Sequence, residues 1–222
     1  MNILALDTST EACSAALLRA DGETFSRFEI TPRGHSSALP AMLDAVLAES
    51  GLDRMDITHV AFANGPGAFT GVRIATATAQ GIAIALSIPL IGISTLAVLA
   101  QRVADEQGVD RVQAVIDARM GEAYSGLYQR DELGVMQRLE EERLLPLTEL
   151  SFDEQARIAG SALQALEQAG LPRPAGDASA LPSAHALLRL ARIQANQARP
   201  GQDASINYLR NQVAVRKPPT VY

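Results

Sequence analysis

The feature that most constrains the fold of this chain is the stretch 65–73, Gly-Pro-Gly-Ala-Phe-Thr-Gly-Val-Arg, because it joins a tight turn to a strong helix signal. The apolar residues 57–63 before it predict a β-strand. The alanine-rich residues 70–86 after it predict an α-helix. The chain therefore contains a strand, a glycine-rich turn and a helix in immediate succession, and the turn brings another group close to the backbone.

The sequence also predicts how this helix begins. Thr70 is the expected N-cap, and Phe69 and Ile74 stand where a hydrophobic staple would fix the entry angle of the chain. Gly65 and Gly67 carry no Cβ, and the first amides of a helix have no partner within it. An anion or a partner's carboxylate could therefore dock at this turn, although a well-built turn that binds nothing fits the same residues.

The rest of the chain falls into two parts. Alternating residues predict three adjacent strands at 3–7, 12–18 and 24–30, with Asp21-Gly22 as a hairpin turn. Amphipathic spacing predicts helices at 37–50 and from 94 or 95 to about 106, with a short strand at 90–93 between the second and third helices. This order, β-β-β-α-β-α-β-α, stops at residues 107–110. Strands resume at 112–116 and 123–128, with helices at 161–168 and 183–197.

Composition limits the class of protein. The 222 residues are 47% hydrophobic, which suffices for a substantial core, and the net charge of −6 argues against a chain that grips a nucleic-acid backbone by itself. Cys13 is the only cysteine, so no intrachain disulfide forms, and we expect it to be a small buried strand residue. The first residues lack a basic region and no apolar run approaches a membrane span, so we expect a cytoplasmic protein.

Four motifs in order resemble those of the TsaB family, which belongs to the bacterial tRNA threonylcarbamoyladenosine pathway. They are Asp-Thr-Ser-Thr at 7–10, the stretch 65–73, Asp-Ala-Arg-Met-Gly-Glu at 117–122 and Tyr-Leu-Arg at 208–210. Together they extend over nearly the whole chain. The sequence departs from the family pattern at Ala68, where Ser is usual, at Ala75, where Gly is usual, and at Ile206 and Asn207.

The resemblance implies an α/β chain of the actin-like ATPase (ASKHA, ribonuclease H-like) fold. It implies an N-terminal subdomain at 1–106 that carries the partner-binding helices, and a smaller one at 107–222 whose last helix packs back on the first subdomain. In such folds the turn after the first strand faces nucleotide phosphates. The candidates for a phosphate-facing role are Asp7, Thr8, Ser9, Gly65, Gly67, Thr70 and Arg73.

The resemblance further implies a non-catalytic partner of TsaD, required for N6-threonylcarbamoylation of adenosine 37 in tRNAs that read ANN codons. TsaD would be bound directly, TsaE within the complex and tRNA only through it, and the chain would also form a homodimer. No cofactor or metal is expected, although ATP or ADP could sit at the complex interface. The expected partner and dimer contacts are Leu39, Met42, Leu43, Val46, Ala75, Thr76, Ala79 and Ala83, and Asp117, Arg119 and Glu122 could form an ion network across the cleft.

Two other functions stay open on the residues alone. A small ATP-dependent kinase could use Asp7 and the following turn, but the second half has no glycine-rich nucleotide loop. A metallopeptidase is opposed by Leu39, because a second histidine four residues after His35 would be needed to share a metal on one helix face. The acidic run 140–142 is expected to be a solvated face, and Tyr208 and Arg210 to support the fold.

Overall fold

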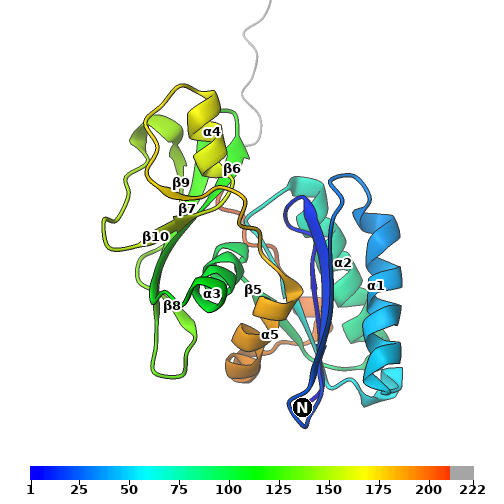
Figure 1. Ribbon diagram of the computed structural model, residues 1–222. Coiled ribbons are helices and arrows are strands. Elements are labelled where there is room, and N and C mark those ends of the chain that lie inside the picture. The colour runs from blue at the N-terminus through cyan, green and yellow to red at the C-terminus, as the bar shows by residue number, and fades with distance from the viewer. Residues whose placement is uncertain (211–222) are drawn as a thin grey trace, which may run out of the picture.

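The computed structural model describes residues 1–210, which form two mixed β-sheets with helices between and outside them (Figure 1). We call the first sheet A and the second sheet B. Sheet A has the strand order β3-β2-β1-β4-β5. Its strands are β1 (Ile3–Asp7), β2 (Ala12–Leu18), β3 (Thr24–Ile30), β4 (His59–Ala63) and β5 (Leu90–Ile93).

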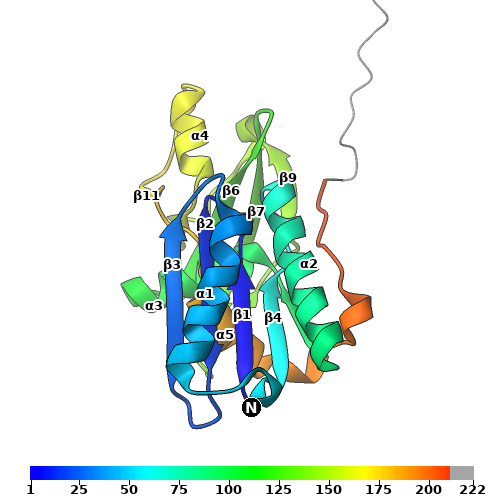
Figure 2. The same ribbon diagram turned by 90° about the vertical axis from the view of Figure 1, so that its right-hand side faces the viewer.

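Sheet A is antiparallel on one side and parallel on the other. β1, β2 and β3 form an antiparallel meander, whereas β4 pairs parallel with β1 and β5 parallel with β4. Helices α1 (His35–Ser50) and α2 (Phe69–Leu86) cover one face of the sheet, as Figure 2 shows, and α5 (Ala184–Ile193) packs on the other. The carboxyl ends of β1 and β4 therefore open at the same edge, where the 65–73 stretch begins.

Sheet B has the order β11-β10-β6-β7-β8, with β9 paired to β7. Helix α3 (Thr95–Gln107) lies between the two sheets and α4 (Ala162–Gln168) covers the outer face of sheet B. The long hairpin of β6 and β7 forms the centre of this half. The strands are β6 (Arg111–Arg119), β7 (Glu122–Arg130), β8 (Met136–Arg138), β9 (Arg143–Pro146), β10 (Arg157–Ala159) and β11 (Gly176–Asp177).

The predicted elements of the first half are confirmed. The strands at 3–7, 12–18, 24–30 and 90–93 agree residue for residue. Helix α1 starts two residues before its predicted position and ends at Gly51, whose φ of 68° is the left-handed conformation that a glycine cap supplies. In the second half the prediction of one helix over 183–197 is wrong, because α5 ends at Ile193 and a separate 3₁₀ turn follows at Ala195–Gln197.

The cores of the two halves are not separate. The predicted boundary at residue 107 falls between α3 and β6, yet one apolar cluster runs from Ile3 and Ala5 of sheet A through α3 to Val112 of sheet B. Helix α5 packs directly on β1 and β2. Two subdomains with these limits stay a prediction, and residues 211–222 of the second lie outside the described part of the chain.

Cys13 is buried in β2 as expected, and burial raises the pKa of its thiol to about 11, so the thiol is inert. The expectation about membrane spans is wrong for α2: its 18 residues have a mean hydropathy of 1.2, which suffices by length and composition alone. One face of α2 packs on sheet A, where Ala75, Ala79 and Ala83 are buried.

Candidate functional site

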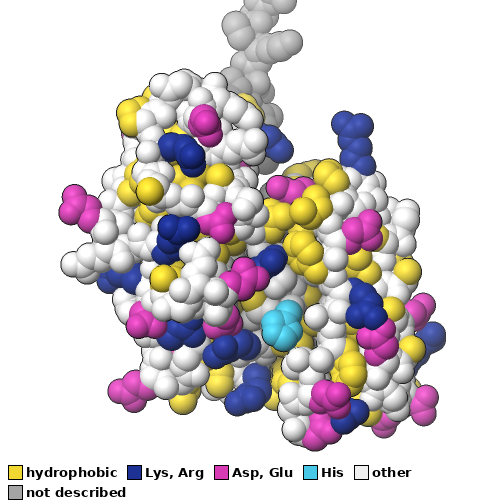
Figure 3. Space-filling view, in the orientation of Figure 1, with side chains coloured by type: hydrophobic (Ala, Val, Ile, Leu, Met, Phe, Trp, Pro, Cys, Tyr) yellow, Lys and Arg dark blue, Asp and Glu magenta, His cyan; other side chains and the backbone are white. Residues whose placement is uncertain are grey.

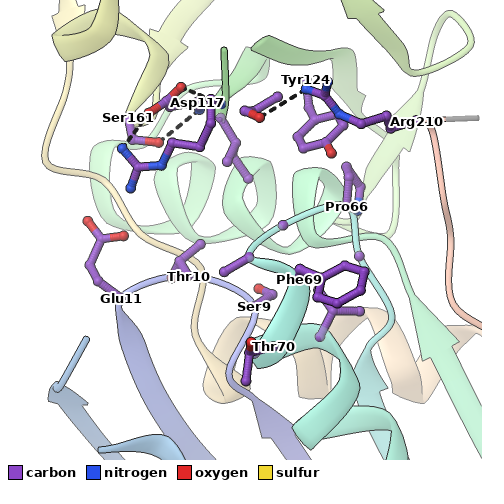
Figure 4. Close-up of a pocket in the computed structure, with 18 of the residues that line it drawn as sticks. Ser9, Thr10, Glu11, Pro66, Phe69, Thr70, Asp117, Tyr124, Ser161 and Arg210 are labelled. Atoms are coloured by element: carbon purple, nitrogen blue, oxygen red, sulfur yellow. Dashed lines mark hydrogen bonds and ion pairs between the residues drawn. The ribbon is translucent and has the colours of Figure 1, made fainter. Parts of the chain in front are cut away.

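An open cavity of about 930 Å³ lies between the halves of the chain and is the candidate site. One wall consists of the turn after β1, the 65–71 stretch and the start of α2, and the other of the end of β6, Tyr124 and α4. Figure 4 shows Ser9, Thr10, Phe69 and Thr70 on the first wall, with Asp117, Ser161 and Arg210 facing them. In Figure 3 hydrophobic side chains gather where the two lobes face each other, and charged side chains lie mainly on the outer surfaces.

The glycines of the 65–73 stretch serve the approach of the chain to itself. A Cβ on Gly67 would collide with the carbonyl oxygen of Ser9, and one on Gly71 would collide with that of Thr8. Two hydrogen bonds stabilise the same contact. The Ala68 amide donates to the Ser9 carbonyl at 2.7 Å, and the Thr8 hydroxyl donates to the Gly71 carbonyl at 2.7 Å. The group held close to this backbone is therefore the turn after β1.

The prediction for the start of α2 is wrong. The helix begins at Phe69 with Ala68 as its N-cap, and no side chain caps its first amides. Thr70 lies within the first turn and lines the cavity. Phe69 is 53% exposed and lies under the guanidinium of Arg73 instead of acting as a staple with Ile74. The sequence misled because Thr70 is a good capping residue, whereas the contact of Ala68 with Ser9 fixes where the helix starts.

The turn after β1 is closed. Asp7 is 2% exposed, and its Oδ1 accepts hydrogen bonds from the amide and the hydroxyl of Ser9 at 2.7 and 2.6 Å. Burial raises the pKa of Asp7, and the bonds from Ser9 partly oppose that rise. Thr8 and Ser9 are fully buried. Neither Asp7 nor Thr8 lines the cavity, and this placement argues against the expected phosphate-facing role for them.

Of the other phosphate-facing candidates, four line the cavity, Ser9, Gly65, Gly67 and Thr70, and Arg73 does not. Arg73 instead lies over the Phe69 ring, 3.5 Å from its centroid, and reaches the hydroxyl of Tyr208 at 3.4 Å. His35 is 7% exposed, with Nε2 2.7 Å from the carbonyl oxygen of Thr10, so it packs the turn after β1. Within residues 1–210, no three His, Cys, Asp or Glu side chains lie close enough to hold a metal ion.

The three charged residues of the 117–122 motif do not form one network. Asp117 pairs with Arg119 at 2.9 Å, whereas Glu122 pairs with Arg210 at 2.6 Å. Arg119 and Met120 adopt left-handed backbone with φ of 64° and 59°, in a turn at the tip of the β6–β7 hairpin. The side chain of Arg119 is 87% exposed and Met120 is 75% exposed. This wall of the cavity therefore presents its side chains to solvent.

The segment Ser205–Arg210 joins the two walls through hydrogen bonds that no sequence pattern indicates. The Asn207 amide donates to the carbonyl of Asn64 at 2.8 Å, and its side-chain amide donates to Glu142 at 3.0 Å. The Glu142 carboxylate also accepts a hydrogen bond from the hydroxyl of buried Tyr128. Burial and that carboxylate raise the pKa of Tyr128 well above its ordinary value. The prediction of a solvated face is wrong for Glu142, which is 8% exposed.

The expected partner contacts also need correction. Six of the eight side chains lie in the core against sheet A and are at most 8% exposed, and the other two, Leu43 and Thr76, are half-buried. The apolar stripe that the helical period reveals is thus the stripe that packs on the chain's own sheet. The buried six are Leu39, Met42, Val46, Ala75, Ala79 and Ala83.

A different set of residues forms what we call the outer helix face. Its members are exposed, small or apolar for the most part, and come from both helices of the outer layer. Ile84 alone leaves 54% of its surface in solvent. Sequence patterns could not single these residues out, because an exposed alanine and a buried one have the same letter. The outer helix face consists of Pro40, Ala41 and Asp44 of α1 and Ala77, Gly81, Ile84 and Ala85 of α2.

The strand order of sheet A, the second mixed sheet and the cavity between them define a protein of the actin-like ATPase fold. A family model described as TsaD, tRNA N6-adenosine threonylcarbamoyltransferase, matches residues 28–215. The tRNA threonylcarbamoyladenosine biosynthesis protein TsaB of Escherichia coli is 44% identical over 72% of this chain and 68% of its own length. TsaB of Haemophilus influenzae is 35% identical over 99% of this chain and 98% of its own.

Solved structures agree with these relatives. YeaZ from Pseudomonas aeruginosa is 41% identical, with a TM-score of 0.86 over 93% of this chain and all of its own. A second Pseudomonas aeruginosa structure, described as an uncharacterized protein with similarity to peptidase YEAZ, has a TM-score of 0.87 at 43% identity and covers 94% of this chain and 99% of its own. The chain belongs to the TsaB (YeaZ) family, which confirms the resemblance and the fold predicted from the sequence.

Proposed function

We propose that this chain acts in tRNA threonylcarbamoyladenosine biosynthesis as the non-catalytic partner of TsaD, as its TsaB-named relatives suggest. In this role it stabilises or activates the enzyme that modifies adenosine 37 of tRNAs reading ANN codons. TsaE joins the complex, tRNA is reached only through it, and the site of action is the cytoplasm. The net charge of −6 supports indirect contact with tRNA.

One observation carries the non-catalytic part of the proposal. In an actin-like nucleotide site, the turn after β1 and the helix start opposite it would offer hydroxyls and amides to phosphate. Here the Ser9 amide and hydroxyl bind Asp7, the Ser9 carbonyl binds Ala68, and the Thr8 hydroxyl binds Gly71. The groups of the turn after β1 are thus already satisfied within the chain, so a phosphate bound to that turn would have to break a buried and internally bonded contact.

The outer helix face is the surface that we assign to TsaD. Small residues such as Ala77 and Gly81 let a partner helix approach closely, and Ile84 supplies exposed apolar area at the end of the same stripe. Of the residues expected from the sequence, Leu43 and Thr76 border this face. ATP or ADP, if it takes part, binds where this chain meets its partner, and the chain itself needs no cofactor.

The test is the solution mass of the chain alone and mixed with TsaD from the same organism, by light scattering on a sizing column. We expect a mixed species, and we expect Ala77→Arg or Ile84→Asp to abolish it because each places charge in an apolar contact. Ala169→Arg, an exposed alanine at the end of α4, is the matched control and should bind as the wild type does. Full binding by both face variants would contradict the assignment of this surface.

The kinase alternative is decided by a separate measurement. Titration of the isolated chain with magnesium-ATP should show no saturable binding, because the hydroxyls and amides of the turn after β1 are bonded within the chain. Saturable binding that Thr70→Val removes would instead support the kinase alternative.

A further inference from the structure

A second cavity, of about 180 Å³, lies at the outer edge of β5, the last strand of sheet A. Strands β4 and β5 form one side of it, and the segment that follows α5, residues 194–205, forms the other. Figure 2 shows this segment, in orange, passing the end of α2. The cavity shares no lining residue with the candidate functional site. Since liquid water takes up about 30 Å³ per molecule, the space suits a metabolite of about six to ten non-hydrogen atoms.

Gly92 contributes unpaired backbone groups to this cavity. The Asn64 amide donates to the carbonyl of Ile93 at 2.9 Å, so odd-numbered residues of β5 direct their polar groups toward β4 and even-numbered ones direct theirs away. Leu90 exchanges two hydrogen bonds with Arg199, at 2.7 and 2.9 Å. The Gly92 amide and carbonyl form no hydrogen bond with any residue in the described range 1–210. Both groups are therefore available to a ligand.

The side chain of Asn64 provides a further unpaired group. Hydrogen bonds to Ile93 and Asn207 hold its backbone in place. Its Oδ1 atom is buried, yet no donor among residues 1–210 bonds to it. The side chain lies beside Gly92, since a Cβ added to Gly92 would be 3.0 Å from Asn64 Nδ2. Buried oxygens of native proteins nearly always accept a hydrogen bond, so this one marks a place where a ligand can donate.

One positive and one negative side chain also line the cavity, and they do not pair. Among residues 1–210, neither Arg199 nor Asp203 forms an ion pair, with the other or with a third residue. Elsewhere in the chain, by contrast, Arg130 and Arg189 both pair with Asp105. Opposite charges held apart at one cavity match a ligand that carries a charge of each sign at its two ends.

We propose that this cavity binds a free α-amino acid with a small side chain, in its zwitterionic form. The carboxylate of the ligand accepts hydrogen bonds from the Arg199 guanidinium and the Gly92 amide. Its ammonium group donates to the Asp203 carboxylate and to Asn64 Oδ1. The amino acid is thus recognised by its two charged ends. The remaining polar side chains of the lining, which surround the side chain of the ligand, are Gln194, Gln197 and Ser205.

Other ligands match this lining less well. Inorganic phosphate or a simple carboxylic acid would place a second negative charge beside Asp203. A divalent cation prefers several carboxylates, and here it would find one and meet the charge of Arg199. A nucleotide is too large, because ligand pockets of its size class start at about 300 Å³. A zwitterion alone uses both charges.

The amino-acid site is independent of the role proposed above. None of its lining residues belongs to the outer helix face or to either helix that carries it. Binding is therefore measured on the chain without TsaD. Failure of the amino-acid site would leave the assignment of the outer helix face to TsaD untouched, and the reverse also holds.

The experiment is an NMR titration of the full, ¹⁵N-labelled chain with glycine, L-alanine and L-serine as probes. We expect saturable shifts of the Gly92 amide signal, with a Kd of about 1 mM or tighter for at least one probe. Arg199→Gln and Asp203→Asn should each weaken binding about tenfold, because each removes a charge-assisted hydrogen bond. Arg192→Gln changes an exposed arginine of α5 that does not line the cavity, so this control should bind as the wild type does.

Two derivatives of serine test which end of the ligand meets which residue. N-acetyl-L-serine has no ammonium group and L-serinamide has no carboxylate, so each should bind the wild type about tenfold more weakly than serine. Asp203→Asn should not weaken N-acetyl-L-serine further, and Arg199→Gln should not weaken L-serinamide further. The derivative series on the wild type requires no variant to fold.

Three results would each overturn the proposal. The first is the absence of a saturable shift with all three probes up to about 10 mM, which is ten times the expected Kd. The second is binding that neither Arg199→Gln nor Asp203→Asn weakens while both variants stay folded by circular dichroism. The third is tighter binding of inorganic phosphate than of any probe, strengthened by Asp203→Asn, which would identify a simple anion site.

Discussion

The two walls of the cavity differ in how their polar groups are used. On the first wall, Asp7, Thr8 and Ser9 are buried and bonded to one another or to the start of α2. On the second, Arg119 and Met120 stand in solvent on a turn of left-handed backbone. A nucleotide would need polar groups from both walls, whereas a protein partner needs only one exposed surface. The closed wall serves stability and the open wall is available for contact.

The largest expected effect on stability comes from a substitution that disrupts the packing of the closed wall. Gly71→Ala places a methyl group against the Thr8 carbonyl, and we expect a loss of about 3 kcal/mol or more in the free energy of unfolding. Urea denaturation measures it. Gly81→Ala is the matched control on the same helix: nothing lies within 4 Å of its added Cβ, so it should stabilise by about 0.5–1 kcal/mol. Equal effects of the two changes would show that the close approach is not required.

The second effect tests the bond between the walls. Glu142→Ala leaves the Tyr128 hydroxyl and the Asn207 amide without their shared acceptor, and should cost about 1–3 kcal/mol of unfolding free energy. Its exposed neighbour provides the control, since Glu141→Ala should stay within about 0.5 kcal/mol of wild type. A loss no larger than the control's would mean that the segment Ser205–Arg210 does not depend on this carboxylate.

The third prediction concerns pH. Because burial raises the pKa of Asp7 above its ordinary 3.8, the folded chain holds this proton more tightly than the unfolded chain does. The contribution of the Asp7 carboxyl to the free energy of unfolding is therefore most favourable below about pH 4. It declines as the pH rises through the raised pKa. Asp7→Asn carries no such proton, so its stability relative to wild type should increase with pH over that range. Urea midpoints from pH 4 to 8 measure the difference, and a flat or falling difference would contradict the prediction.

The smallest expected effect on stability comes from a change on the open wall of the cavity. Arg119→Glu should change the unfolding free energy by no more than about 0.5–1 kcal/mol, because the exposed pair with Asp117 is weak. A contact of this exposed turn with TsaD would make the reversal lower the affinity about tenfold, which titration calorimetry measures. Arg173 does not line the cavity, so the control variant Arg173→Glu should bind TsaD as the wild type does. Unchanged affinity in folded Arg119→Glu would remove this turn from the interface.

Much of the fold could be read from local patterns. The strand limits of the first half came from alternation, and the end of α1 from Gly51, because these signals act within a few residues. The start of α2 could not be read this way, since it depends on a contact between Ala68 and Ser9, far apart in sequence. Helix period located the apolar faces of α1 and α2, but it could not say whether a sheet or a partner covers them.

The sequence by itself determined the family, the order of strands and helices in the first half, and the presence of a glycine-rich turn that another group approaches closely. Those features depend on short-range periodicity and on residue types at fixed spacing. Only the tertiary structure decided that Gly67 and Gly71 admit the chain's own carbonyls, that Glu142 is buried, and that Leu39 and Ala79 face inward while Ala77 and Ile84 face outward. The physical reason is that burial and hydrogen-bond satisfaction are properties of packed surfaces, which residues distant in sequence create together.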